Sequence, residues 1–320
     1  MHWRAISAAA RGSRPSCRPS LSRLPRARGQ VDERDGGRRA CRYGQLRAML
    51  AAEVGPVHFI AGGTDMLIAG RPLPGTGLLV DLARVAGMAF ISTDDTDIRI
   101  GGTTTVAALA ADCGLRARFP ALCEAAAQCG SVQIRNRATI AGNIANAAPA
   151  ADLMPVLFAA GARLVLIGRD GAPREVALCD YAPSLGYLIT EVILPANALF
   201  PYSAFVKLGP RRDMTISRLN LALLAEYQNN HFGAVRVEAG ALGPGPLRLP
   251  LAEIALAGRK LEPATLRDFL SALGAEVDAA IPGRNSQIYK RRAAAGLGLD
   301  LIAQAVGLSP RDRLFEEAAE

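Results

Sequence analysis

The chain has 320 residues, of which 50% are hydrophobic and 21% charged, a composition that excludes a largely disordered protein and allows two domains. Its net charge of +8 is uneven: residues 1–40 hold ten arginines and three acids, so the other 280 residues carry a surplus of one positive charge. This near-neutral remainder gives no support for nucleic-acid binding, and no apolar run of about 18 residues predicts a membrane span.

Residues 1–40 are rich in Arg, Ser, Pro and Gly and lack a hydrophobic period. This composition predicts a disordered or non-native N-terminal extension. A transit peptide is an alternative, because importers recognise Arg- and Ser-rich segments that are poor in acids. A nucleic-acid-binding arm is a third possibility.

Between residues 41 and 200, helical and extended patterns alternate. Helices are predicted at residues 45–53, 105–112 (capped by Thr103 or Thr104), 120–130 and 155–161. Strands are predicted at residues 58–61, 77–81, 98–100, 163–168 and 188–194, with a hairpin turn at Asp170-Gly171. This alternation favours an α/β domain.

Beyond residue 201 the pattern changes to longer strands followed by helices. Strands are predicted at residues 203–208, 220–228 and 234–242, with a turn at 229–233, and helices at 251–257, 265–273 and 286–306. We therefore expect a second, α+β domain with a three-stranded antiparallel sheet over residues 201–310, followed by a tail at 311–320.

The six cysteines are Cys17, Cys41, Cys113, Cys123, Cys129 and Cys179. None forms a C-x-x-C pair, and no Cys/His group has the spacing of a zinc or iron–sulfur site. We therefore predict no metal ligands, and reduced, mostly buried thiols as in a cytoplasmic protein.

Two segments combine glycine with hydroxyl, amide and carboxylate side chains. Residues 61–66 read A-G-G-T-D-M, and residues 139–152 read T-I-A-G-N-I-A-N-A-A-P-A-A-D. Glycine lets successive backbone N–H groups turn toward an anion, and hydroxyls and amides add directed donors. Neither segment is a P-loop or a Rossmann fingerprint. Together they predict a ligand with two phosphates held from two sides, although Asp152 alone also reads as a helix cap.

The second segment carries a resemblance to a known family. Residues 133–143 read Q-I-R-N-R-A-T-I-A-G-N, and further matches are I-L-P at 193–195, F-V-K at 205–207, G-P-G-P-L-R at 243–248 and I-Y-K-R-R at 288–292. From about residue 43 to 306 the chain resembles the FAD-binding medium subunit of the molybdenum hydroxylases, the xanthine dehydrogenase and carbon monoxide dehydrogenase family. Ala141 stands where glycine is common, and the usual N-terminal strand pattern is degenerate at residues 38–50.

The resemblance implies an α+β fold of the vanillyl-alcohol-oxidase (PCMH) type, with FAD between two α/β subdomains and the second domain beyond. Lys207 would lie near the flavin, unless it is a solvated strand lysine, and Thr215 replaces an acid usual in the family, beside Ile216. No catalytic residue is identified, and these three are candidates for tuning the flavin. The implied cofactor-binding residues are Phe59, Ile60, Ala61, Gly62, Gly63, Thr64, Asp65, Met66, Cys129, Ala138, Thr139, Ile140, Ala141, Gly142, Asn143, Asn146, Asp152, Ile189 and Lys207.

The implied function is electron transfer. FAD would take electrons from a small [2Fe–2S] subunit and pass them to NAD, oxygen or a quinone, while a large molybdopterin subunit oxidises the substrate, in a cytoplasmic dimer of heterotrimers. Two alternatives are a self-contained FAD-dependent oxidase or reductase with its own organic substrate, and a flavin-free scaffold subunit.

Overall fold

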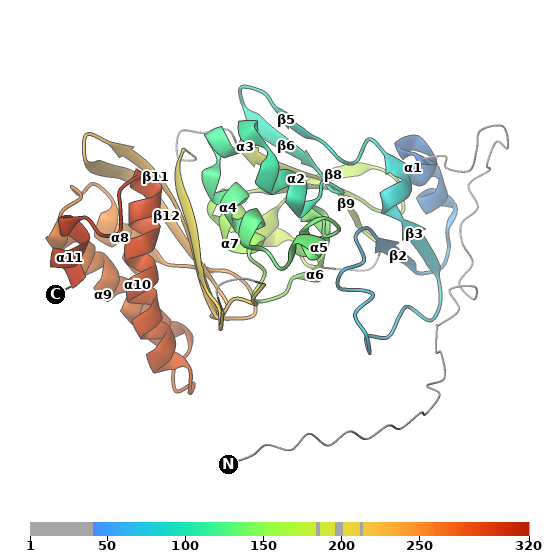
Figure 1. The fold of residues 1–320 in the computed structure, drawn as a ribbon. Helices are drawn as coiled ribbons and strands as arrows, with labels where there is room; N and C mark the ends of the chain where they lie inside the picture. The colour runs from blue at the N-terminus through green and yellow to red at the C-terminus, as the bar shows by residue number, and fades with distance from the viewer. Residues whose placement is uncertain (1–40, 184–185, 196–200, 212–213, 320) are drawn as a thin grey trace, which may run out of the picture.

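The structure is a computed structural model that describes residues 41–183, 186–195, 201–211 and 214–319. The predictions for residues 1–40 lie outside this range. Three separate hydrophobic clusters form the interior, and they follow one another broadly along the sequence. Figure 1 shows the helices and strands of the first two clusters on one side of the molecule and those of the third on the other.

The smallest cluster packs α1 (Tyr43–Ala52) against short parallel strand pairs. Leu46 and Leu50 of the helix are buried with Val57 and Val80 from the strands. The pairs are β1 (Cys41–Arg42) with β4 (Val85–Ala86), and β2 (Val57–Ile60) with β3 (Leu78–Asp81), which a 3-10 turn at Leu82–Arg84 follows. The first glycine segment begins where β2 ends.

The second cluster contains a five-stranded sheet, in which every described pairing is antiparallel. Its order is β5 (Ile91–Thr93), β6 (Asp97–Gly101), β9 (Leu188–Pro195), β7 (Arg163–Ile167) and β8 (Pro173–Ala177). The expectation of an alternating α/β domain is therefore wrong for this sheet. The predicted turn with Gly171 (φ 66°) makes β7 and β8 a hairpin, and β9 returns between β6 and β7.

The two faces of this sheet differ in chemistry. Ile98, Ile100 and Val192 are fully buried, whereas Arg99 and Glu191, next to them in the strands, carry charge. On the charged face Arg163 bonds Asp97 at 2.7 Å and Glu175 at 2.6 Å, and Arg99 bonds Glu191 at 3.1 Å. This alternation is typical of a sheet with one solvated face.

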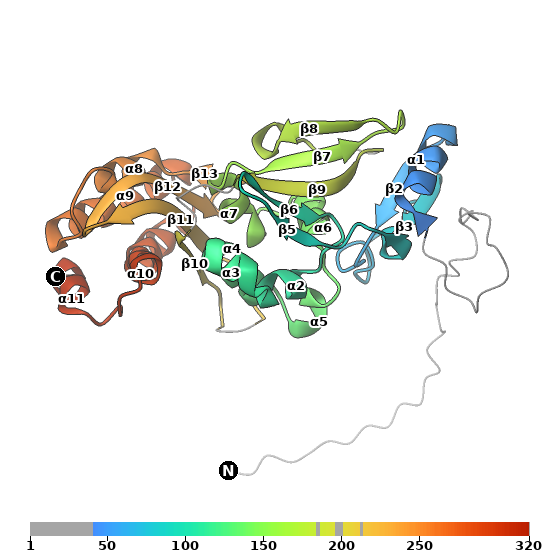
Figure 2. The same cartoon turned by 90° about the horizontal axis from the view of Figure 1, so that it is seen from above.

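Six short helices lie between β6 and β7 in the sequence, and Figure 2 shows them gathered on one side of the sheet. They are α2 (Val106–Ala111), α3 (Cys113–Arg118), α4 (Pro120–Gln128), α5 (Val132–Arg135), α6 (Ile140–Asn146) and α7 (Leu153–Ala159). The cap of α2 is Thr105, whose hydroxyl accepts from the Ala108 N–H, rather than Thr103 or Thr104. Thr104 is buried, and its hydroxyl bonds both backbone groups of Phe90.

The third cluster lies between an antiparallel meander and four helices. The sheet has four strands rather than the expected three: β10 (Tyr202–Leu208), β11 (Leu219–Gln228), β12 (His231–Gly240) and β13 (Leu247–Arg248). The turn before β12 is only Asn229-Asn230, both with positive φ, which suits a two-residue hairpin. The helices are α8 (Pro250–Leu256), α9 (Pro263–Ala280), α10 (Gln287–Val306) and α11 (Arg313–Ala319).

The opposite face of the meander packs on α4 and α7, so the parts of the chain before and after residues 196–200 share an interface. Phe205, Ala222 and Leu224 of the meander belong to the second cluster with α4 and α7. In the described residues, no helix is long and apolar enough to cross a bilayer.

Glu238 of β12 is buried at this interface, on the face opposite Val237 and Ala239 of the third cluster. Burial first, and then the nearby Glu253 carboxylate, raise its pKa from 4.5 to about 7, against the opposing effects of Arg248 and Arg236. The folded chain thus holds a proton that the unfolded chain releases at a lower pH. The free energy of unfolding therefore falls as the pH rises from 4.5 through 7.

We predict that Glu238→Gln removes this pH dependence. The stability advantage of the wild-type chain over the variant should fall by about 3 kcal/mol between pH 4.5 and 7.5, the equivalent of this pKa shift. Urea unfolding of both chains across this range measures the difference. A difference independent of pH would show that Glu238 ionises normally in the folded chain.

Candidate functional site

The first glycine segment is a turn that follows β2. Residues 61–66 are half-buried, so their backbone remains within reach of a ligand. Gly63 has a φ of 72°, a conformation that favours glycine. Gly62 is required for a steric reason, because a Cβ added there would overlap the carbonyl group of Arg137. The first segment therefore packs directly against the chain leading into the second.

The second segment opens α6. Thr139 caps this helix, and its hydroxyl accepts a hydrogen bond from the Gly142 N–H at 3.1 Å. Ile140 and Ala141 point into the protein and are buried. The helix ends at Ala147, which has a φ of 46°. Residues 138–143 thus form a capped helix start beside the first segment.

Two arginines that the sequence analysis missed join the segments. The guanidinium of Arg71 donates to the Asp65 carbonyl at 3.2 Å and to the Asn146 side-chain oxygen at 3.5 Å. Arg137 donates to the Gly62 carbonyl at 3.4 Å. Both arginines are surface-exposed, and nothing in their local sequence signals this pairing. The structure therefore brings together the two halves of the predicted site.

The residues here fit a ligand with hydroxyl and phosphate groups. The Asn143 side-chain oxygen is buried and has no hydrogen-bond partner among the described residues, which is costly unless a donor arrives. Phe59 and Ile60 precede the turn and are half-buried, so they offer apolar surface beside it. Ile189 of β9 is buried, and its carbonyl lies against Gly102, where a Cβ would also approach Ala141. These features suit FAD, whose ribityl hydroxyls donate and whose phosphates accept.

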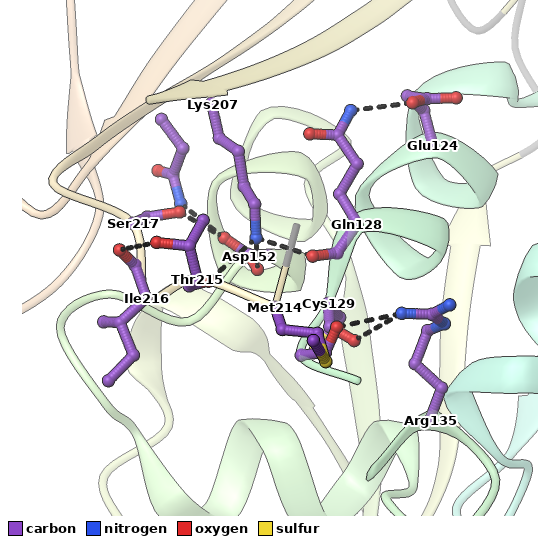
Figure 3. Close-up of polar contacts among 12 residues, drawn as sticks. Glu124, Gln128, Cys129, Arg135, Asp152, Lys207, Met214, Thr215, Ile216 and Ser217 are labelled. Carbon is purple, nitrogen blue, oxygen red and sulfur yellow. Dashed lines mark hydrogen bonds and ion pairs between the residues drawn. The ribbon is translucent and has the colours of Figure 1, made fainter. Parts of the chain in front are cut away.

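A second group of predicted residues gathers at the interface between the meander and α4 and α7 (Figure 3). The ammonium of Lys207 on β10 donates to the Asp152 carboxylate at 2.8 Å, the Gln128 carbonyl at 2.6 Å and the Thr215 carbonyl at 3.2 Å. The two charged side chains are only 5% and 6% exposed. The alternative of a solvated strand lysine is therefore wrong.

Asp152 does not use its side chain to cap α7, so that interpretation is also wrong. Its second oxygen accepts from the Ser217 hydroxyl at 2.6 Å and from the Asn220 amide at 3.2 Å. A buried ion pair needs such additional donors, because desolvation of both charges opposes their attraction. Gln128, Ser217 and Asn220 were not predicted. Only Asn220 has a sequence feature that could have indicated a polar contact, because its amide stands between Leu219 and Leu221 in an apolar strand. In the structure it is fully buried.

Cys129 lies next to Gln128 and close to the ion pair. Burial first, and then the Asp152 carboxylate, raise the pKa of its thiol to about 11, although Lys207 and Arg135 oppose this shift. The thiol therefore stays protonated near neutral pH, which excludes a nucleophilic thiolate role. Arg135 donates to the Cys129 and Gly130 carbonyls at 3.3 and 2.9 Å and thereby fixes the C-terminal end of α4 (Figure 3).

Thr215 and its neighbours complete the second group. Thr215 is buried, and its side chain occupies the space that a Cβ on Gly209 would need. Met214 has a φ of 49°, and Ile216 is 78% exposed, so an apolar side chain stands in solvent beside the buried pair. Residues 212 and 213 of this segment lie outside the described range.

Comparison with known proteins identifies the family. The family model described as the FAD binding domain in molybdopterin dehydrogenase matches residues 39–197, and the CO dehydrogenase flavoprotein C-terminal domain matches residues 204–305. The chain belongs to the FAD-binding subunit family of the molybdenum hydroxylases. It is therefore part of an oxidoreductase, and FAD is its cofactor.

Individual members of this family cover most of the chain. The nicotinate dehydrogenase FAD-subunit of Eubacterium barkeri is 28% identical over 79% of this chain and 90% of its own length. The xanthine dehydrogenase FAD-binding subunit of Escherichia coli O157:H7 is 29% identical over 80% and 91%. The structure of reconstituted CO dehydrogenase from Oligotropha carboxidovorans shares the fold, with a TM-score of 0.73, 23% identity and coverage of 85% and 97%.

Proposed function

We propose that this chain is the electron-transfer subunit of a molybdenum hydroxylase complex. It would receive electrons from a partner [2Fe–2S] subunit and deliver them to NAD, oxygen or a quinone, while a large molybdopterin subunit carries out the hydroxylation. The observation that carries this proposal is the contact between the two glycine segments, which makes one cradle of two distant parts of the sequence. Its relatives carry the names of FAD subunits and medium chains of dehydrogenases.

The chain's own residues bind and orient the cofactor. Backbone N–H groups of residues 61–66 would hold the phosphates, with Thr64 and Asn146 as side-chain donors. The N–H groups of residues 140–143 at the start of α6 already donate within the protein, so this helix contributes through its side chains. The unpaired oxygen of Asn143 would accept from a hydroxyl. FAD, when bound, supplies the redox chemistry, since its ring exchanges electrons with donors and acceptors in turn.

The second group of residues, at the interface between the meander and α4 and α7, would tune the flavin. Asp152 neutralises the charge of Lys207, so the electrostatic field around this pair depends on how Ser217 and Asn220 hold it. Thr215 brings a neutral hydroxyl where the family usually has an acid, and Ile216 adds exposed apolar surface. We propose these residues as determinants of potential and acceptor preference rather than as proton donors.

We also propose how the chain divides into subdomains and domains. The separate clusters around α1 and around the five-stranded sheet support two subdomains of the vanillyl-alcohol-oxidase type. Domain limits at residues 41–200 and 201–310, a cytoplasmic location and a dimer of heterotrimers are further parts of this proposal. The predicted tail at 311–320 is not retained, because α11 buries Phe315 in the third cluster.

Purification of the tagged full-length chain from its native cells tests the assignment. We expect it to bring down a small iron–sulfur protein and a large molybdopterin protein, with iron, molybdenum and FAD in fixed ratios. A tagged Gly75→Val chain is the control and should bring down the same proteins, since nothing lies within 4 Å of the added Cβ. A chain that purifies alone, with FAD and without iron or molybdenum, would contradict the proposal.

A further inference from the structure

An open cavity of about 570 Å³ lies where the second glycine segment meets the C-terminal part of the chain. Pro149 and Ala150 form one wall, and the others are formed by residues just before β11, just after β12 and around the start of α10. The volume lies in the range of about 300–1,000 Å³ that is common for small-molecule sites. Of its lining residues, only Ser217, which donates to Asp152, belongs to a group with a proposed role toward the flavin.

The charges around the cavity are all positive. Arg218, Arg284 and Lys290 line it, and the lining contains no aspartate or glutamate. Within the described part of the chain, neither arginine side chain forms a hydrogen bond or ion pair, and Lys290 donates only to the Ala241 carbonyl, at 2.5 Å. Partial burial lowers the pKa of Lys290, and Arg284 and Arg218 lower it further. Like charges held around one cavity repel, and an anion between them would relieve that repulsion.

The walls of the cavity are tied together rather than loosely adjacent. The Ala241 N–H donates to the Pro149 carbonyl at 2.9 Å, while the Ala241 carbonyl accepts from Lys290. Ala241 holds a φ of 63°, which is unusual for a residue with a Cβ. This residue therefore links the second glycine segment to α10 across the interface.

The beginning of α10 adds donors to the same space. This helix is 20 residues long, and Ser286 at its start makes no side-chain cap, so its hydroxyl is available to a ligand. The positive end of the helix dipole adds to the charge of Arg284 and Lys290. Tyr289 is 47% exposed on the rim.

We infer that this cavity binds a small phosphorylated molecule through a multiply charged phosphate group. Three cations and a free hydroxyl suit the several acceptor oxygens of a phosphate, and guanidinium groups match its geometry. The concave shape and modest volume favour a small ligand over a protein surface. The site is distinct from the proposed FAD cradle, so the chain would hold a second phosphorylated ligand beside its cofactor.

Inorganic pyrophosphate is the probe for this inference. It is titrated calorimetrically into the full chain loaded with FAD, so that the cradle is occupied. We expect saturable binding that Arg284→Ala and Lys290→Met each weaken by at least about tenfold, since each removes a charged hydrogen-bond donor. Arg218→Ala is a third, independent variant. Arg292→Ala is the matched control, because Arg292 is exposed on the same helix and does not line this cavity.

Three results would overturn the inference. They are no binding at millimolar pyrophosphate, equal weakening by Arg292→Ala, and loss of binding when FAD is loaded, which would assign the cavity to the cofactor itself. Failure of the proposed function is recognisable separately. A chain that takes up no FAD contradicts that function, whereas pyrophosphate binding that depends on Arg284 and Lys290 but not on Gly62 would still support this cavity.

Discussion

Gly62→Val is expected to weaken FAD binding by at least about 100-fold, the equivalent of about 3 kcal/mol, which is a usual cost of forcing atoms into a packed site. The cause is specific. A Cβ at this position overlaps the Arg137 carbonyl, so the first glycine segment must move away from the second. Gly62 itself belongs to none of the three hydrophobic clusters, and we expect the variant to keep its circular dichroism spectrum. Equilibrium titration of the FAD-free chain with FAD measures the effect.

Two further glycine variants calibrate this result. Gly75→Val, in an open position within the same part of the chain, should bind FAD like the wild type. Gly142→Val should fall between the two, because only the movable Thr139 hydroxyl, 2.9 Å away, obstructs a Cβ there. Its main cost is the Thr139 cap, about 1 kcal/mol. If Gly62→Val binds FAD as tightly as Gly75→Val, the two segments do not form the cradle.

Breaking the buried Asp152–Lys207 pair is expected to have the second large effect. Lys207→Met leaves an uncompensated carboxylate that is 6% exposed, and Asp152→Asn leaves an uncompensated ammonium that is 5% exposed. Removal of one partner from a buried ion pair costs about 3–5 kcal/mol, whereas removal of both costs much less than the sum. The double variant should therefore be more stable than the sum of the two single effects predicts.

Urea unfolding of the four chains as a double-mutant cycle measures this coupling. Glu175→Gln is the control, because its partner Arg163 lies on the solvated sheet face and exposed pairs contribute only about 0–1 kcal/mol. Additive effects of the two single variants would show that Asp152 and Lys207 are not coupled in the folded chain. An unchanged flavin reduction potential in Ser217→Ala would argue against a role of this group in tuning the flavin.

The sequence predicted the local features of this protein well. Both glycine segments and most of the longer helices and strands follow from turn chemistry and hydrophobic period. The three-residue strand β5 escaped prediction because so short a segment has no measurable period. The expectation of an alternating α/β domain was wrong because the antiparallel pairing of β9 with β6 and β7 is set by packing between distant segments.

The interface group shows where prediction from residues alone ends. Lys207 and Asp152 were both singled out, yet their contact joins positions 55 residues apart, and that with the Gln128 carbonyl joins positions 79 apart. A backbone carbonyl has no sequence signature. The buried Asn220 in an apolar strand was the one detectable sign that a polar partner lies opposite it.

Anaerobic reduction of the flavin tests the central claim, that this chain transfers electrons and does not oxidise an organic substrate itself. The FAD-loaded chain is mixed with aldehydes, purines and N-heterocycles, first alone and then with the reduced iron–sulfur partner obtained by co-purification. We expect the visible absorbance of oxidised flavin to persist with the organic compounds alone and to bleach when the partner is added. Rapid bleaching by an organic compound without the partner would contradict this account and identify a self-contained flavoenzyme.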